Sequence, residues 1–251
     1  MIALYTDFGC TGPYLGQVRT AIIGQAPEIP IVDLMSDVPA FNPKAAAYLL
    51  AALVPEFPVA TVFLCVIDPG VGTGMRAPVM LHCDGRWFVG PDNGLFELVQ
   101  RRASHVCKWI ITWQPSRLSS TFHGRDLFAP VAAALARGET VPGTLVDAKA
   151  GMAHRQWPDD LGEVIYIDGF GNATTAIRAS TIEDPSTQWL CCGDIRIPYG
   201  TTFGDVPSGD LLWYENSNGL VEIGANQGSA AQRLKLGVGS VVRFTPGEPD
   251  S

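Results

Sequence analysis

The stretch VATVFLCVIDPGVGTGMR, residues 59–76, decides the fold of the first half of the chain. Its first part, residues 59–67, is nearly all apolar, which is typical of a strand covered on both faces in a parallel sheet. Asp68, Pro69 and Gly70 follow at once, so the strand ends in a polar loop. Ligands of open α/β sheets bind beyond the carboxyl ends of such strands, which makes this loop a candidate site.

On both sides of this stretch, short apolar runs alternate with helical patterns of apolar residues. Strands are predicted at residues 2–5, 31–34, 79–82 and 87–89, the last two as a hairpin, and helices at 17–26, 45–54, 94–101 and 127–137. This alternation predicts an α/β N-terminal domain with a mostly parallel central sheet.

The composition changes beyond about residue 140, where proline, glycine and aspartate become frequent. Short strands separated by turn signals are predicted at residues 163–167, 174–177, 188–191, 211–214, 220–223 and 240–244. They predict a smaller, antiparallel β-barrel as the C-terminal domain. We therefore expect two domains, residues 1–155 and 156–251.

The charge of the chain argues against a nucleic-acid partner. Its 17 basic and 25 acidic residues give a formal net charge of −8, with no dense run of lysine or arginine. Nucleic acids and anionic membranes are bound by clustered positive charge. No apolar stretch reaches the ~18 residues of a membrane span, and the N-terminus lacks the pattern of a signal peptide. The six cysteines form no CxxC pair, which favours buried, reduced thiols in a cytoplasmic protein.

Four polar segments of the first domain follow a predicted strand or precede a predicted helix. They are TDFG at 6–9, DPGVGTGMR at 68–76, GPDNG at 90–94 and TFHGRD at 121–126. Asp7 and Asp68 both come just after apolar strands, so both are placed for one shared site. A strand-end aspartate before glycine or proline is also a common turn former, and the pattern alone leaves both interpretations open.

His123 is the most informative histidine, since Gly124 beside it leaves room for a ligand. The charged neighbours Arg125 and Asp126 can set its protonation. The chain contains no HxH, HExxH or comparable spacing, so no metal site is predicted. The glycine cluster at 70–74 also lacks the Lys-Ser/Thr ending of a phosphate loop.

The second domain carries DGFGN at 168–172, NSNG at 216–219 and GANQG at 224–228. Residues of these types are common in hairpin turns. They also form a set of short polar groups around one aromatic, Phe170, which suits a purine and an amino-acid head group. The pattern alone does not separate these two interpretations.

Six motifs of the chain, taken in order, resemble those of one family, the S-adenosylmethionine hydroxide adenosyltransferases, which are related to the fluorinases and chlorinases. The motifs are TDFG, DPGVGT, FVGPDNGL, TFHGRDLFAP, IDGFGN and NSNG…EIGANQGSA, and they span nearly the whole chain. The resemblance implies hydrolysis of S-adenosylmethionine to adenosine and methionine by an activated water, with no metal or other cofactor. It also implies a homotrimer in which the ligand lies between the N-terminal domain of one subunit and the C-terminal domain of its neighbour.

The same resemblance implies roles for individual residues. Asp68, Arg76 and His123 would hold and activate the water, and Asp7 would bind both ribose hydroxyls. The other implied substrate contacts are Phe8, Phe41 and Asn93 in the first domain and, in the second, Asp168 and Ser217 for methionine, Phe170 and Asn172 for adenine, and Asn226.

One departure from the family pattern concerns the arginine. The family has two adjacent basic residues after the glycine loop, and Met75 stands in place of the first of them. A protein that binds S-adenosylmethionine without turning it over is therefore the alternative function. Halide transfer is disfavoured, because a charged Asp68 would repel a halide and the halogenating relatives lack both this carboxylate and the imidazole of His123. Asn218 stands where those relatives carry an arginine.

Overall fold

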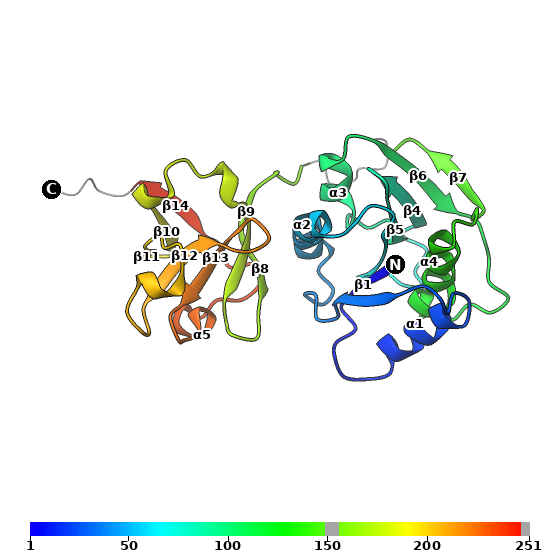
Figure 1. Ribbon diagram of the computed structural model, residues 1–251, viewed down its shortest axis with the longest axis horizontal. Helices are drawn as coiled ribbons and strands as arrows, with labels where there is room; N and C mark the ends of the chain where they lie inside the picture. The colour runs from blue at the N-terminus through cyan, green and yellow to red at the C-terminus, as the bar shows by residue number, and fades with distance from the viewer. Residues whose placement is uncertain (149–155, 247–251) are drawn as a thin grey trace. The chain divides into compact units, whose positions relative to one another are not determined.

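The computed structural model describes residues 1–148 and 156–246. The chain divides into two compact units, Met1–Gln156 and Trp157–Ser251, and each has a hydrophobic core of its own. In Figure 1 the first unit consists of helices around a central sheet, and the second consists mostly of short strands. The first unit is therefore an α/β domain and the second a β domain.

The first unit alternates strands and helices along the chain, as the sequence predicts. Its elements are β1 (Ile2–Thr6), α1 (Tyr14–Ile23), β2 (Ile31–Met35), α2 (Pro43–Leu53), the 3-10 turn η1 (Val54–Glu56), β3 (Val62–Val66), β4 (Pro78–Cys83), β5 (Arg86–Pro91), α3 (Glu97–Arg102), β6 (Val106–Ile111), the π-helical turn η2 (Gly124–Phe128), α4 (Ala129–Ala136) and β7 (Gly143–Val146). Strands β6 and β7 are additions to the predicted set.

The strands of this unit form one sheet in the order β2-β1-β3-β5-β4-β6-β7. Pairing is parallel from β2 to β5 and antiparallel from β5 to β7. The prediction of a mostly parallel sheet is therefore wrong, and the sheet is only partly parallel. The reason is the β4–β5 hairpin, which turns at Asp84 and Gly85 with φ of 45° and 83°, and whose antiparallel side is extended by β6 and β7.

Helices cover both faces of this sheet (Figure 1). α1 and α4 pack against each other, and α4 contacts β1, β3 and β5. α2 packs on α3, which lies with it on the opposite face. Asn42 caps α2 by accepting the amide of Ala45 at 3.0 Å, and Pro43 occupies its first turn. Strands β1 and β3 are buried along their whole length, which explains their continuous apolar sequence.

The strand order reverses at β1, because β2 lies on one side of it and β3 on the other. Thr6 of β1 pairs with Val66 of β3 at the carboxyl ends of the two strands. Asp7 and Asp68 therefore leave the sheet at the same edge. Reversal points of this kind open a crevice in which α/β proteins bind ligands.

The second unit is built from short antiparallel strands. Its elements are β8 (Leu161–Ile167), β9 (Ala173–Arg178), β10 (Gln188–Cys192), β11 (Ile195–Ile197), β12 (Leu211–Glu215), β13 (Leu220–Ala225), α5 (Ala230–Leu234) and β14 (Arg243–Pro246), with the 3-10 turns η3 (Ala179–Thr181), η4 (Pro185–Thr187) and η5 (Phe203–Asp205). They form two small sheets, in the orders β12-β13-β9-β8 and β11-β10-β14.

Among the residues that the structure describes in this unit, the regular ladders form two small antiparallel sheets, and closure into the predicted barrel is not shown. Outside the two ladders, strands meet through isolated bridges such as that of Tyr199 with Trp213. A second bridge, of Glu163 with Val241, links the other edges of the two sheets. The antiparallel pairing of this unit is therefore confirmed, and closure into a barrel stays a prediction.

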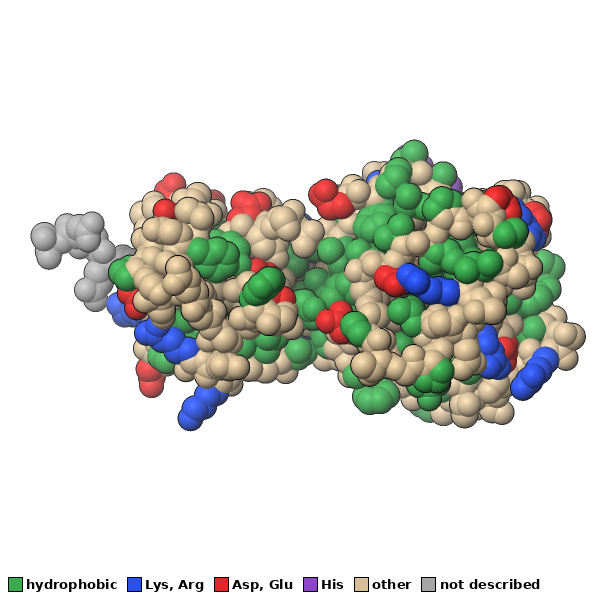
Figure 2. Space-filling view, turned by 60° about the horizontal axis from the view of Figure 1, so that its bottom comes forward, with side chains coloured by type: hydrophobic (Ala, Val, Ile, Leu, Met, Phe, Trp, Pro, Cys, Tyr) green, Lys and Arg blue, Asp and Glu red, His purple; other side chains and the backbone are tan. Residues whose placement is uncertain are grey.

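None of the described helices is long and apolar enough to cross a membrane. On the face drawn in Figure 2, lysine and arginine side chains lie scattered among other residues.

All six cysteines have free thiols. Cys65, Cys83 and Cys191 are buried, but Cys10 and Cys107 are exposed, so the prediction of buried thiols is only partly right.

Candidate active site

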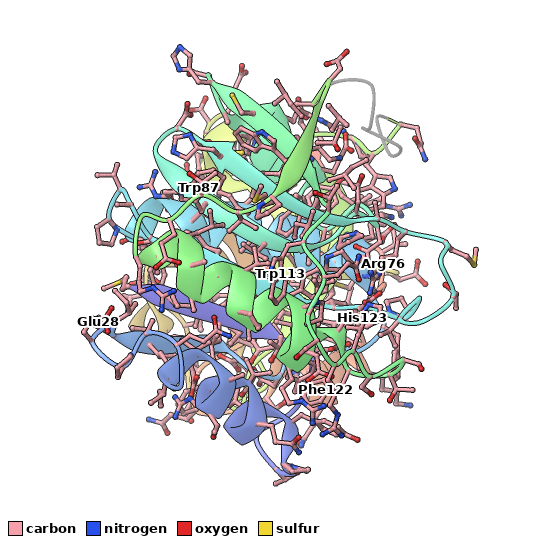
Figure 3. The ribbon with its side chains drawn as sticks, turned by 90° about the vertical axis from the view of Figure 1, so that its right-hand side faces the viewer. Glu28, Arg76, Trp87, Trp113, Phe122 and His123 are labelled. Carbon is pink, nitrogen blue, oxygen red and sulfur yellow. The ribbon has the colours of Figure 1, made fainter. Side chains whose placement is uncertain are left out.

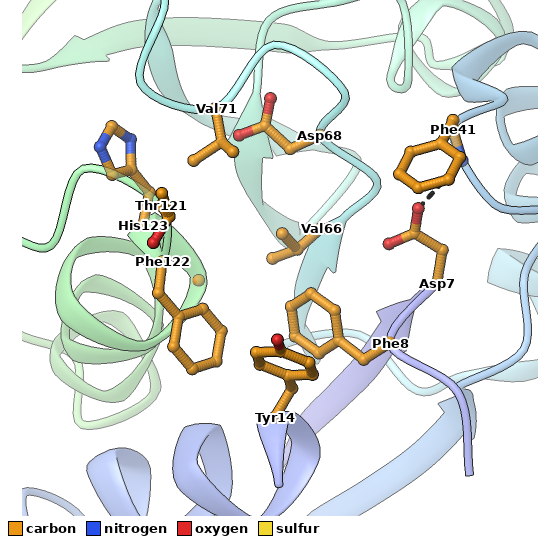
Figure 4. Close-up of a pocket in the computed structure, with 11 residues that line it drawn as sticks. Asp7, Phe8, Tyr14, Phe41, Val66, Asp68, Val71, Thr121, Phe122 and His123 are labelled. Carbon is orange, nitrogen blue, oxygen red and sulfur yellow. Dashed lines mark hydrogen bonds between the residues drawn. The ribbon is translucent and has the colours of Figure 1, made fainter. Parts of the chain in front are cut away.

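A cavity of about 320 Å³ lies where β1 and β3 end, at the reversal point of the sheet (Figure 4). Its walls come from the loops after these two strands, the first turn of α1, the loop before α2 and the segment that leads into η2. The lining residues are Asp7, Phe8, Tyr14, Phe41, Val66, Asp68, Val71, Thr121, Phe122, His123 and Gly124. The structure thus brings together five of the residues named from the sequence: Asp7, Phe8, Phe41, Asp68 and His123.

Asp7 is held by the loop before α2. Its Oδ2 accepts a hydrogen bond from the amide of Phe41 at 3.1 Å, drawn as a dashed line in Figure 4. Phe41 has a φ of 59°, a conformation uncommon outside glycine, and its side chain is highly exposed. Burial raises the pKa of the Asp7 carboxyl, although the backbone hydrogen bond opposes this shift. An acceptor and an exposed aromatic ring therefore share one rim of the cavity.

Asp68 and Arg76 form a buried ion pair beside the cavity. Arg76 Nε donates to Asp68 Oδ1 at 3.0 Å and its Nη2 donates to Oδ2, so the contact is bidentate. The two side chains are only 5 % and 7 % exposed. The guanidinium also lies over the ring of Phe128, 5.5 Å from its centre. Met75 is 87 % exposed, so Arg76, and not its neighbour, reaches the carboxylate.

Arg76 also contacts His123, and Figure 3 shows the two side chains next to each other. Its Nη2 lies 3.1 Å from Nδ1 of the imidazole. A guanidinium can only donate, so Nδ1 is the acceptor and the ring proton lies on Nε2. Burial and the Arg76 cation lower the pKa of His123, while Asp68 and Asp126 act in the opposite direction. His123 is therefore a neutral imidazole whose Nε2–H can donate.

The glycine loop after β3 fits closely against the segment that carries His123. A Cβ at Gly72, where φ is 75°, would lie 2.4 Å from the carbonyl oxygen of Ser120, so this approach requires glycine. Asp126 accepts the amide of Ser119 at 2.8 Å and is paired with Arg125. Arg125 and Asp126 thus shape the loop and do not line the cavity.

Besides Phe41, three packed aromatic rings line the same cavity, those of Phe8, Tyr14 and Phe122. The ring centres lie 6.1 Å apart for Phe8 and Tyr14, 5.7 Å for Phe8 and Phe122, and 5.3 Å for Tyr14 and Phe122. Sequence reasoning does not find Tyr14, because the helical pattern predicts a helix from residue 17, whereas α1 begins three residues earlier. The available signal is an aromatic residue five positions after the TDFG loop.

Asn93 is not among the residues that line the cavity. Its Nδ2 donates to the carbonyl of Ile67 at 2.9 Å, and its Oδ1 accepts the amide of Leu95 at 3.3 Å. The nitrogen and the oxygen of the Asn93 side chain are therefore both hydrogen-bonded within the domain. Ile67, which accepts one of these bonds, directly precedes Asp68. The structure places Asn93 as a support for this loop.

A second cavity, of about 630 Å³, lies within the second unit. It is lined by Asp168, Phe170, Asn172, Phe203, Ala225, Gln227 and Gly228. Asp168 Oδ1 accepts the amides of Phe170 and Asn172 at 2.9 and 2.8 Å, and its Oδ2 accepts Asn172 Nδ2 at 2.9 Å. The carboxylate therefore fixes the turn that presents Phe170, which is 82 % exposed.

The other residues named for this unit lie outside the lining of the second cavity. Ser217 is exposed in the turn between β12 and β13. Asn226 uses its Nδ2 to donate to the carbonyl of Val206 at 2.8 Å. Phe203, by contrast, lines the cavity and was missed, because it lies in a segment without strand pattern.

The comparisons with known proteins agree with the resemblance read from the motifs. The N-terminal domain model of the SAM hydroxide adenosyltransferases matches residues 2–144, and the C-terminal domain model matches residues 162–243. An (R)-S-adenosyl-L-methionine hydrolase of Thermus thermophilus is 39 % identical over 95 % of this chain and 97 % of its own length. A fluorinase of Actinopolyspora mzabensis is 26 % identical over 98 % of this chain and 97 % of its own.

A solved structure extends the agreement to three dimensions. An uncharacterised conserved protein from Thermotoga maritima superposes with a TM-score of 0.87 at 30 % identity, covering 97 % of this chain and 99 % of that one. The predicted family resemblance is confirmed by these matches. The chain belongs to the S-adenosylmethionine hydroxide adenosyltransferase family, with the fluorinases as more distant relatives.

Proposed function

We propose that this protein hydrolyses S-adenosylmethionine to adenosine and methionine. The observation that carries the proposal is the cluster in which the buried Asp68–Arg76 pair contacts the half-buried His123 at the first cavity. The near full-length similarity to an (R)-S-adenosyl-L-methionine hydrolase supports it. Arg76 contacts both Asp68 and His123, so a guanidinium is present in the cluster although Met75 replaces the first basic residue, and this supports turnover over binding alone.

The chemistry follows from the groups present. Water attacks the ribose C5′ and forms a C–O bond while the C–S bond breaks. The electron pair of the C–S bond stays on sulfur, so methionine leaves as a neutral thioether. Arg76 can only donate, and His123 donates from Nε2, so Asp68 is the acceptor among the three for the proton that the water loses. Held in this way, the water is oriented for attack and the developing charge is offset.

The remaining contacts are divided between the two units. Asp7 binds the ribose hydroxyls, and the exposed ring of Phe41 covers the sugar. In the second unit, Phe170 and Phe203 provide flat walls for adenine, with Asn172 as a polar partner. Asp168 and Ser217 serve the methionine head group, and the two half-sites combine between neighbouring subunits of a homotrimer.

The test is to incubate the purified protein with S-adenosylmethionine, with and without excess chloride, and to identify products by chromatography and mass. Adenosine and methionine are expected in equal amounts, whether or not chloride is present. A chlorinated nucleoside would instead indicate halide transfer. Bound ligand that stays intact would indicate a binding protein.

Replacing Asp7 by alanine is expected to weaken S-adenosylmethionine binding by about 10- to 100-fold, because a charged acceptor for two hydroxyls is lost. The value of kcat at saturating substrate should stay within about threefold of wild type, since Asp68, Arg76 and His123 are unchanged. Calorimetric titration and initial rates measure the two quantities. A dissociation constant equal to that of wild type would remove Asp7 from the ribose site.

The pH profile is expected to report His123. Its pKa lies below the ordinary value of 6.5, so the neutral ring persists as the pH falls past 6.5. Activity is then lost as the pH falls through this lowered pKa, because protonation places a second cation against Arg76. The profile of kcat/KM from about pH 5 to 8 measures this acid limb. A limb at or above 6.5, or the same limb in His123→Gln, would contradict the assignment.

A further inference from the structure

Glu222 of β13 is a buried carboxylate, 9 % exposed, in the four-stranded sheet of the second unit. Three donors converge on it. Its Oε2 accepts Thr174 Oγ1 at 2.5 Å and Asn216 Nδ2 at 2.9 Å, and its Oε1 accepts the hydroxyl of Tyr214. These bonds compensate a charge that would otherwise be costly to bury. One carboxylate thereby joins β9, β12 and the turn after β12.

The bond to Asn216 fixes the turn that carries Ser217. Oδ1 of Asn216 accepts the amides of Asn218 and Leu220, both at 3.0 Å. The Asn216 side chain therefore holds the turn with its oxygen while its nitrogen is held by Glu222. Loss of the carboxylate would free this side chain and, with it, the position of Ser217.

The bond to Tyr214 fixes an aromatic wall of the second cavity. The ring of Tyr214 packs edge-on against Phe203, with centres 5.2 Å apart. The packing is tight: a Cβ at Gly224 would lie 2.7 Å from Phe203, 3.0 Å from Tyr214 and 3.2 Å from Oδ1 of Asn172. Burial and the hydrogen bond to Glu222 raise the pKa of Tyr214, so its hydroxyl keeps its proton and remains a donor. A shift of Tyr214 would be passed to Phe203, which lines the cavity.

We propose that Glu222 is a positioning residue for substrate binding, which fixes the 216–219 turn and the Phe203 wall although it does not line the cavity itself. The inference rests on the proposed function, since it assigns these two features to the adenine and methionine parts of the substrate. Glu222 acts through Tyr214 and Asn216, and none of its three hydrogen-bond donors belongs to the cluster of Asp68, Arg76 and His123.

Replacing Glu222 by alanine is expected to raise KM for S-adenosylmethionine by about tenfold or more and to leave kcat within about threefold. Glu222→Gln should restore most of the affinity, because its oxygen still accepts from Thr174 and Asn216 and its amide can donate to the Tyr214 oxygen. If Glu222→Ala does not fold, Tyr214→Phe keeps the ring and is expected to raise KM by about threefold or more.

Thr245→Ala is the control in the same unit. The Oγ1 of Thr245 lies 3.2 Å from Sγ of Cys191 in the β10–β14 ladder, and neither residue lines the second cavity. This variant should leave KM unchanged. An unchanged KM in the folded Glu222→Ala or Tyr214→Phe variant, or an equal rise in the Thr245 variant, would overturn the inference. If the wild type released no adenosine, the proposed function would fail by itself, and the dissociation constant for adenosine would then test Glu222 separately.

Discussion

Asp68→Asn is expected to lower kcat by about 100-fold or more, while the dissociation constant for S-adenosylmethionine changes by no more than about threefold. The side chain is 5 % exposed and accepts two bonds from Arg76, so it is held in one orientation at the cavity. Asparagine keeps the size of the group but turns an acceptor into a donor that faces the guanidinium. Single-turnover rates and ligand titration measure the two effects.

A matched ion pair on the surface provides the control. Arg19 and Asp33 form the same kind of bidentate contact, but their side chains are 42 % and 32 % exposed and neither lines the cavity. Asp33→Asn should leave kcat and the dissociation constant unchanged, because exposed pairs contribute little. Wild-type turnover in Asp68→Asn would sink the assignment of Asp68 as the proton acceptor.

The parts of the fold that the sequence predicts are those in which one local pattern dominates. β1 and β3 are continuous apolar runs, and both were located to within a few residues. β6 was missed because its sequence includes Lys108, a residue type that argues against a buried strand. Lys108 is 1 % exposed and pairs with Asp92 at 2.8 Å, a partner that no local pattern reveals. Without β6 and β7, the antiparallel half of the sheet is not predicted.

Local sequence patterns likewise predict some residues of the candidate site and not others. Asp7 and Asp68 could be placed together from sequence, because carboxyl ends of adjacent parallel strands meet at one edge. Tyr14 and Phe203 reach their cavities through packing between distant segments, which periodicity does not encode. Asn93 lies in the FVGPDNGL motif, yet its side-chain amide donates to the backbone carbonyl of Ile67. A motif thus identifies the segment, while the hydrogen-bond partners decide which side chains face the cavity.

Arg76→Met is expected to lower kcat by about 100-fold or more and to destabilise the fold by about 3 kcal/mol, because it leaves a buried carboxylate without its cation. Its side chain is 7 % exposed and contacts both Asp68 and His123, so one change removes both interactions. Initial rates and thermal unfolding measure the two losses. Met75→Ala is the adjacent control, and its 87 % exposed side chain predicts wild-type values for both.

The double variant Met75→Arg/Arg76→Met tests whether an arginine at position 75 can replace the one at position 76. It restores the basic residue that the family carries first after the glycine loop and removes the one that this structure uses. Because position 75 projects into solvent while position 76 faces Asp68, the double variant should be as impaired as Arg76→Met alone. Recovery of turnover would mean that the loop can shift by one residue and that either position can supply the guanidinium. A persistent loss of turnover would mean that the backbone between Gly72 and Pro78 determines which residue contacts Asp68 and His123. Methionine is then tolerated at position 75 because Arg76 already binds the Asp68 carboxylate.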